Sequence, residues 1–139
     1  MNVFGWWRNR RAKKLMASMS AQEKVEVRAM IVFHLSLAGQ VHMMTTSQVS
    51  ATEHADVFEE VGRRQGVSVG RLSSESSPED RSAAGRARIV VGPLSEFLTD
   101  FTREDDRENS VRDKFAVVEG RPVSAALPML AQYREIRVT

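Results

Sequence analysis

The segment from Val25 to Leu37 constrains the fold more than any other part of this sequence. Every odd position in it is apolar, whereas the even positions include Glu26, Arg28 and His34. Strict alternation of this kind, with several β-branched side chains, is typical of a strand that buries one of its two faces. The pattern therefore predicts a strand here.

A helix is the alternative for the same segment. Met30 and Val32 interrupt the polar side of the alternation, and Ser20 stands three residues before Glu23. The Ser-x-x-Glu spacing is that of a capping box, in which the serine and glutamate side chains each bond a free backbone N–H at a helix start. The choice between strand and helix decides the fold.

The later part of the chain carries shorter signals. A second Ser-x-x-Glu spacing at Ser50 begins a predicted helix that ends near Gln65, where Gly66 suits a helix stop. Leu94, Phe97, Leu98 and Phe101 share one helical face after Pro93. The other predicted elements are strands at 67–69, 86–91 and 114–119 and a last helix at 124–136.

Residues 73–84 are rich in serine and acidic side chains and have little apolar surface to bury. We therefore predict a flexible loop over this range. The predicted order from Val25 onward is then strand, helix, strand, loop, strand, helix, strand, helix. This order predicts an α+β fold, a ferredoxin-like split βαβ sandwich. If Val25–Leu37 is helical, the alternative is a mostly helical bundle.

Length and composition place limits on the class of protein. A chain of 139 residues with 42% hydrophobic residues is long enough for one domain with a real core. The absence of cysteine excludes disulfides, thiolate metal sites and cysteine nucleophiles. The longest apolar run, 29–33, is far short of the roughly 20 residues that cross a bilayer. We expect a cytoplasmic protein without a transmembrane segment.

The first 19 residues differ from the rest of the chain. They contain both tryptophans and five of the 20 basic residues, but no acidic residue, so the remaining 15 bases face all 18 acids. We therefore divide the chain into a basic, aromatic arm at 1–19 and a mildly acidic globular domain at 20–139. The arm supplies all the candidate partner-binding residues: Phe4, Trp6, Trp7, Arg8, Arg10, Arg11, Lys13 and Lys14.

Three kinds of partner fit this arm. Tryptophan and arginine dominate the energetics of protein interfaces, and an acidic stretch at 96–108, on the same or a neighbouring subunit, is one acceptor. Bases and aromatic rings also bind the phosphates and unpaired bases of nucleic acid. An anionic membrane surface is the third partner, but basic and aromatic residues do not separate cleanly around a helix here. We favour a protein partner or self-association, then nucleic acid, then membrane.

No motif in the chain identifies a reaction. There is no glycine-rich phosphate loop, and the three histidines lack the spacing of a helical metal site. His34 is a candidate general base if it lies on an open sheet face. The sequence predicts no catalytic residue, metal or cofactor. It favours a non-enzymatic binding or assembly module, with a nucleic-acid-binding protein and then a small α+β enzyme near His34 as alternatives.

Overall fold

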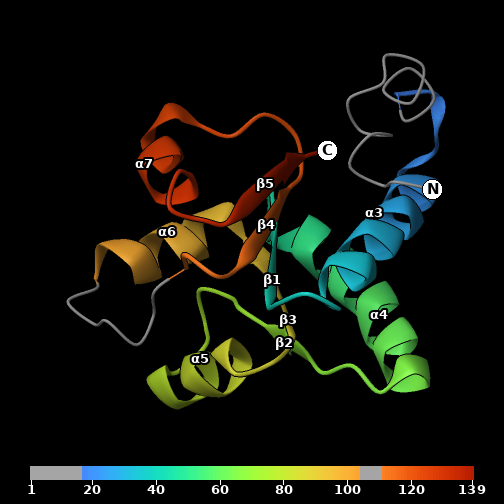
Figure 1. Ribbon diagram of the computed structural model, residues 1–139, viewed down its shortest axis with the longest axis horizontal. Helices are drawn as coiled ribbons and strands as arrows, with labels where there is room; N and C mark the ends of the chain where they lie inside the picture. The colour runs from blue at the N-terminus through green and yellow to red at the C-terminus, as the bar shows by residue number, and fades with distance from the viewer. Residues whose placement is uncertain (1–16, 104–110) are drawn as a thin grey trace.

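The computed structural model describes residues 17–103 and 111–139 and contains a five-stranded sheet in which all neighbouring strands are parallel (Figure 1). The strand order is β2-β3-β1-β4-β5, so β1 lies at the centre. The strands are β1 (Val41–Thr45), β2 (Val69–Arg71), β3 (Ile89–Pro93), β4 (Phe115–Val118) and β5 (Glu135–Val138).

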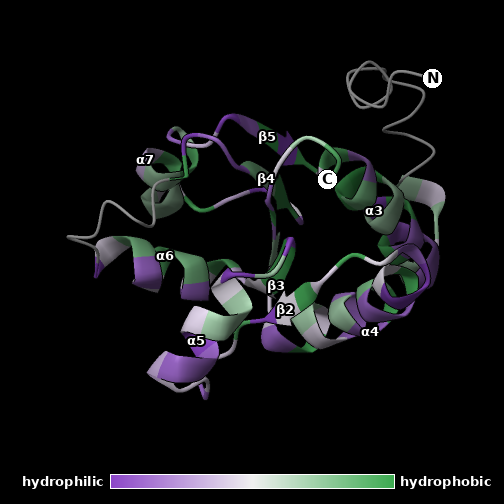
Figure 2. Ribbon diagram, turned by 60° about the horizontal axis from the view of Figure 1, so that its bottom comes forward, coloured by the Kyte–Doolittle hydropathy of each residue, from purple (hydrophilic) through white to green (hydrophobic). Residues whose placement is uncertain are grey.

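Helices cover both faces of the sheet, as Figure 2 shows. Helices α3 (Ala21–Leu35) and α4 (Gln48–Gln65) pack on one face. The opposite face is covered by α5 (Pro78–Gly85), α6 (Leu94–Thr102), the short 3-10 helix η2 (Ser124–Ala126) and α7 (Leu127–Leu130). The connection from β1 to β2 runs over one face and the connections from β2 onward run over the other, as in a doubly wound sheet.

Two apolar cores result, one on each face. Val41 and Met43 of β1 point into the core beneath α3 and α4, together with Phe58. Met44 points into the opposite core, where it joins Phe97 of α6 and Met129 of α7. A parallel strand buried on both faces reads as a short apolar run rather than as an alternation. For this reason the sequence pattern does not reveal β1.

The strand predicted for Val25–Leu37 is wrong, because these residues form most of α3. The capping box predicted from Ser20 and Glu23 is confirmed: the Ser20 hydroxyl accepts from the Glu23 backbone N–H, and the Glu23 carboxylate accepts from the Ser20 backbone N–H. Helix α3 is buried over a wide arc because it packs on both the sheet and α4. Odd and even positions are therefore buried together, and the apparent alternation is incidental.

The ferredoxin-like sandwich is also wrong, since every strand pair is parallel. A helical bundle is excluded by the same sheet. The broader expectation of a mixed helix-and-strand fold is confirmed. The predicted strands at 67–69, 86–91 and 114–119 correspond, with shifted ends, to β2, β3 and β4.

Several helix predictions need correction at their ends. Helix α4 begins one turn earlier than predicted, with Ser47 as its N-cap, and ends at Gly66 in the left-handed conformation (φ 70°), as expected. Residues 73–84, predicted as a loop, contain α5, whose N-cap Ser77 forms a capping box with Asp80. The last predicted helix is short, and the chain continues into β5. Helix α6 matches its prediction.

Candidate functional site

The carboxyl edge of the sheet is where a doubly wound fold is expected to bind a ligand. The connections leave β1 and its two neighbours toward opposite faces at this edge. In this chain the turn after β1 reads Thr-Thr-Ser and enters α4 without a glycine. The edge is filled instead by side chains from α3, from α4 and from the residues that follow β1, β4 and β5. We call this group the edge cluster: Arg28, Thr46, Ser50, His54, Glu119 and Thr139.

Arg28 is the centre of the edge cluster and is only 5% exposed. Its Nε donates to Oγ1 of Thr139 at 2.8 Å, and its Nη1 lies 3.3 Å from Nε2 of His54 and 3.4 Å from Oε2 of Glu119. Burial lowers the pKa of Arg28, and the carboxylate of Glu119 opposes that shift. A charged arginine in the interior needs such partners, because an unpaired buried charge is very costly.

Glu119 follows β4 and connects it to the start of α4. Its Oε1 accepts from the backbone N–H of Thr46 at 2.9 Å and from the hydroxyl of Ser50 at 2.7 Å. Burial acts to raise the pKa of Glu119, but these hydrogen bonds outweigh it, so the pKa is lowered. The carboxylate therefore stays ionised at neutral pH.

His54 is 1% exposed and completes the edge cluster. Its Nδ1 lies 2.7 Å from the backbone oxygen of Ser50, so this nitrogen carries the proton. Its Nε2 then accepts from Arg28. Burial lowers the pKa of His54, which favours the neutral ring. The polar groups of the cluster are committed to one another and hold α3, α4, β4 and the segment after β5 together.

A second histidine, His42, is partly buried on the other face of the sheet. Nδ1 of His42 is 2.5 Å from the Tyr133 hydroxyl, and its ring lies 5.0 Å from that of Phe97. Burial, with a smaller contribution from Lys114, lowers the pKa of His42 to about 3. Its Nε2 is occupied by Gln40 at 3.1 Å. Both ring nitrogens are bonded within the protein, so His42 is a packed structural histidine.

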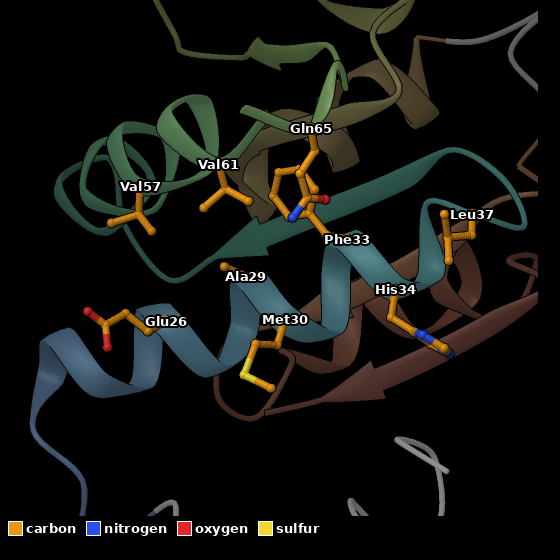
Figure 3. A pocket seen from close by; sticks show the side chains of 9 residues that line it. All are labelled: Glu26, Ala29, Met30, Phe33, His34, Leu37, Val57, Val61 and Gln65. Carbon is orange, nitrogen blue, oxygen red and sulfur yellow. The ribbon is translucent and has the colours of Figure 1, made fainter. Parts of the chain in front are cut away.

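Unlike the edge cluster, the surface between α3 and α4 carries exposed apolar side chains (Figure 3). It forms a groove with a volume of about 450 Å³. Met30 and Leu37 are 67% and 81% exposed, respectively, although both are large apolar residues. Val57 and Val61 point from α4 toward α3. The residues that line the groove are Glu26, Ala29, Met30, Phe33, His34, Leu37, Val57, Val61 and Gln65.

The two ends of the groove differ. Glu26, the only carboxylate among the described residues of its lining, lies at the end nearest the start of α3, and Leu37 lies at the other end with His34 beside it (Figure 3). Glu53 is exposed one helical turn before Val57. The floor of the groove is part of the core, because the Phe33 ring packs edge-on against Phe58 at a centroid distance of 6.0 Å.

The predicted arm residues, from Phe4 to Lys14, lie outside the residues that the structure describes. His34 lies on the exposed side of α3 and lines the groove, so its predicted place on an open sheet face is wrong. Within the predicted acidic acceptor, Glu96 and Asp100 each bond Arg81, at 2.8 and 2.7 Å. Residues 104–108 of that stretch lie outside the described residues.

Neither a metal centre nor a membrane-spanning helix is found among the described residues. No three His, Asp or Glu side chains between 17 and 103 or between 111 and 139 are grouped to hold a metal ion. Over the same ranges, no helix combines the length and apolar character needed to cross a membrane.

Sequence reasoning missed both surfaces. The strand prediction places Arg28 on a polar face, although a charge inside an otherwise apolar run is itself a sign of a buried pair. The groove had one usable signal, because Met30 and Leu37 are seven residues apart and share a helical face.

No known protein-family model matches the chain. It is 30% identical over 107 residues to the Protein translocase subunit SecA of Neisseria meningitidis serogroup A / serotype 4A (strain DSM 15465 / Z2491), covering 76% of this chain and 11% of the relative. The identity to Protein translocase subunit SecA of Acidithiobacillus ferrooxidans (strain ATCC 53993 / BNL-5-31) is also 30%, over 93 residues, which are 66% of this chain and 10% of the relative. The chain thus spans about a tenth of the length of these curated relatives and is similar to one segment of a translocase subunit.

Proposed function

We propose that this chain is a non-enzymatic binding or assembly module that docks a protein partner or a neighbouring subunit. The observation that carries the proposal is the α3–α4 groove, in which Met30 and Leu37 are exposed beside Val57 and Val61. An amphipathic groove of this kind binds an apolar polypeptide segment. The similarity to a subunit of a protein translocase supports a role in contact with other proteins.

The N-terminal arm is the second part of the proposed binding surface. Trp6 and Trp7 would anchor the contact through apolar burial, and the five bases between Arg8 and Lys14 would add electrostatic attraction. The nucleic-acid alternative uses the same arm. The enzyme alternative rests on His34 at a sheet face, which the fold removes, so it is not proposed.

Light scattering and binding titrations test the proposal. The full chain would be measured alone for self-association, and then with reduced, carboxymethylated α-lactalbumin, which is a permanently unfolded polypeptide. Single-stranded RNA and vesicles containing phosphatidylglycerol serve as competing probes. Self-association or binding of the unfolded polypeptide supports the proposal. Tight binding of RNA or vesicles without either result overturns it.

Paired variants separate anchoring by tryptophan from phosphate binding. For a partner that the arm itself binds, we expect Trp6→Ala with Trp7→Ala to weaken binding more than Arg10→Ala with Arg11→Ala, and the binding to be only mildly sensitive to salt. Phosphate binding by several bases instead weakens steeply with salt, with a slope that scales with the number of contacts. The opposite ranking, together with a steep salt dependence, favours nucleic acid.

A further inference from the structure

We infer that the N-terminal arm binds in the α3–α4 groove of its own chain, with Trp6 and Trp7 against the exposed side chains of Met30 and Leu37. This rests on the proposed function only in that the arm is taken as a binding element. When the arm occupies the groove, a partner of the arm or of the groove has to displace this intramolecular contact, and binding is thereby regulated.

The order of chemical character along the arm matches the order along the groove. Moving back from Ala17, the chain first presents the five bases and then Trp7, Trp6 and Phe4. Moving along the groove from the start of α3, the surface first presents Glu26, the one carboxylate among its described lining residues, and then Met30 and Leu37. The uncharged amide of Gln65 and the ring of His34 lie beside these two side chains. A chain that folds back along α3 therefore sets bases beside acids and aromatic rings beside apolar side chains.

The length of the arm permits this arrangement. Trp7 stands ten residues before Ala17, which is an extended reach of about 33 Å. The distance along the α3 axis from Ala21 to Phe33 is about 18 Å at the helical rise of 1.5 Å per residue. A tether this short gives a local concentration in the millimolar range, about that of short flexible linkers. The groove of the same chain therefore has an advantage over that of a second copy.

The other acidic and polar surfaces of the described domain are poorer acceptors. Glu96 and Asp100 already bond Arg81, whose side chain is 11% exposed. In the edge cluster, the carboxylate of Glu119 is held by Thr46 and Ser50. The α3–α4 groove combines an exposed acidic margin with exposed apolar side chains, and it begins where the arm joins the domain.

Tryptophan fluorescence tests the inference directly, because Trp6 and Trp7 are the only tryptophans in the protein. Acrylamide quenching would be measured on the full chain and on a Met30→Lys, Leu37→Lys variant. Val49→Lys is the matched control, since Val49 is 70% exposed but does not line the groove. All three positions are exposed, so the fold should tolerate each change.

We expect blue-shifted, protected tryptophan emission in the wild type that does not change on dilution. The groove variant should raise the quenching constant by about twofold or more, as for rings released from an apolar site, and the control should not. Emission typical of free tryptophan in the wild type overturns the inference, as does protection that the groove variant leaves intact. Protection that disappears on dilution, together with a dimer by light scattering, overturns it in favour of the groove of a second copy.

The same samples distinguish failure of this inference from failure of the proposed function. If the unfolded polypeptide binds while the tryptophans are fully quenchable, the proposed function stands and the inference falls. If the tryptophans are protected, but neither the wild type nor a Trp6→Ala, Trp7→Ala variant, in which the groove is released, self-associates or binds that polypeptide, the inference stands and the proposed function falls.

Discussion

The edge cluster and the α3–α4 groove both involve helices α3 and α4, but they differ in how far their side chains are exposed to water. At the edge, Arg28 and Glu119 are largely withdrawn from water and bonded to neighbours on several elements. In the groove, Met30 and Leu37 are left in contact with water. The carboxyl edge, where a doubly wound sheet is expected to bind ligands, is thus filled by side chains of the edge cluster. The groove between α3 and α4 remains accessible to a partner.

Under the proposed function, the edge cluster serves stability and the groove serves binding. Buried polar groups that satisfy one another fix the packing of the elements they join. Neighbouring exposed apolar side chains contribute little to folding and mark surfaces that a partner can cover. Substitutions at the edge should therefore change unfolding, whereas substitutions at the groove surface should change binding and leave unfolding almost unaffected.

The largest expected effect on the free energy of unfolding is at the floor of the groove, where a buried and an exposed residue are neighbours in sequence. Phe33→Ala should lower the free energy of unfolding by about 3–4 kcal/mol, because the ring is 7% exposed and packs on Phe58. The adjacent His34→Ala should change it by less than about 0.5 kcal/mol, since His34 lies on the exposed side. Urea unfolding measures both. Equal effects would mean that the floor is not part of the core.

Loss of the central charge of the edge cluster comes next. Arg28→Met should destabilise by about 2–3 kcal/mol, because it leaves Glu119 and His54 without their shared donor. This loss is smaller than that for a fully buried pair because the Glu119 side chain is 18% exposed. Adding Glu119→Gln should recover part of the loss in a double-mutant cycle. Strict additivity of the two changes would argue against the pairing.

The pH dependence of stability tests the neutral state of His54. Its pKa in the folded protein lies below the ordinary value of 6.5, so between these values only the unfolded chain takes up the proton. Stability is therefore complete above about pH 6.5 and falls as the pH drops, by up to about 1.4 kcal/mol per pH unit for one histidine.

His54→Gln should remove part of this slope in urea unfolding between pH 7 and 5. The remaining pH dependence comes from His42, because its pKa of about 3 in the folded protein also makes stability fall as the pH drops. The low pKa of Glu119 acts below about pH 4.5, outside this window. A slope identical to that of the wild type would show that His54 is not held neutral by the cluster.

How much of this structure could be predicted from the sequence depends on how many sides of an element are buried. Helix α6 buries one face, and its spacing predicts it correctly. Helix α3 is covered on two sides, so Ile31, Val32 and Phe33 are all buried and its helical period is hidden. β1 is buried on both faces and shows no alternation. The edge cluster joins Arg28 to Glu119 across 91 positions, a pairing that no local pattern encodes.

The smallest effect on stability is expected at the groove surface. Met30→Lys should change the free energy of unfolding by less than about 0.5 kcal/mol, since Met30 is 67% exposed. The same change should weaken binding of the unfolded polypeptide, because it places a charge on the apolar surface. Val49→Lys should alter neither property. A large loss of stability in Met30→Lys would show that this side chain serves the core.

Methyl NMR of the seven methionines compares the two surfaces in one experiment. Met30 reports on the groove, and Met44, which is fully buried at the end of β1, reports on the carboxyl edge. On titration of the full chain with the unlabelled unfolded polypeptide, the Met30 methyl signal should shift and the Met44 signal should not. A shift of Met44 with Met30 unchanged would place binding at the sheet edge and contradict the assignment of the groove as the binding surface.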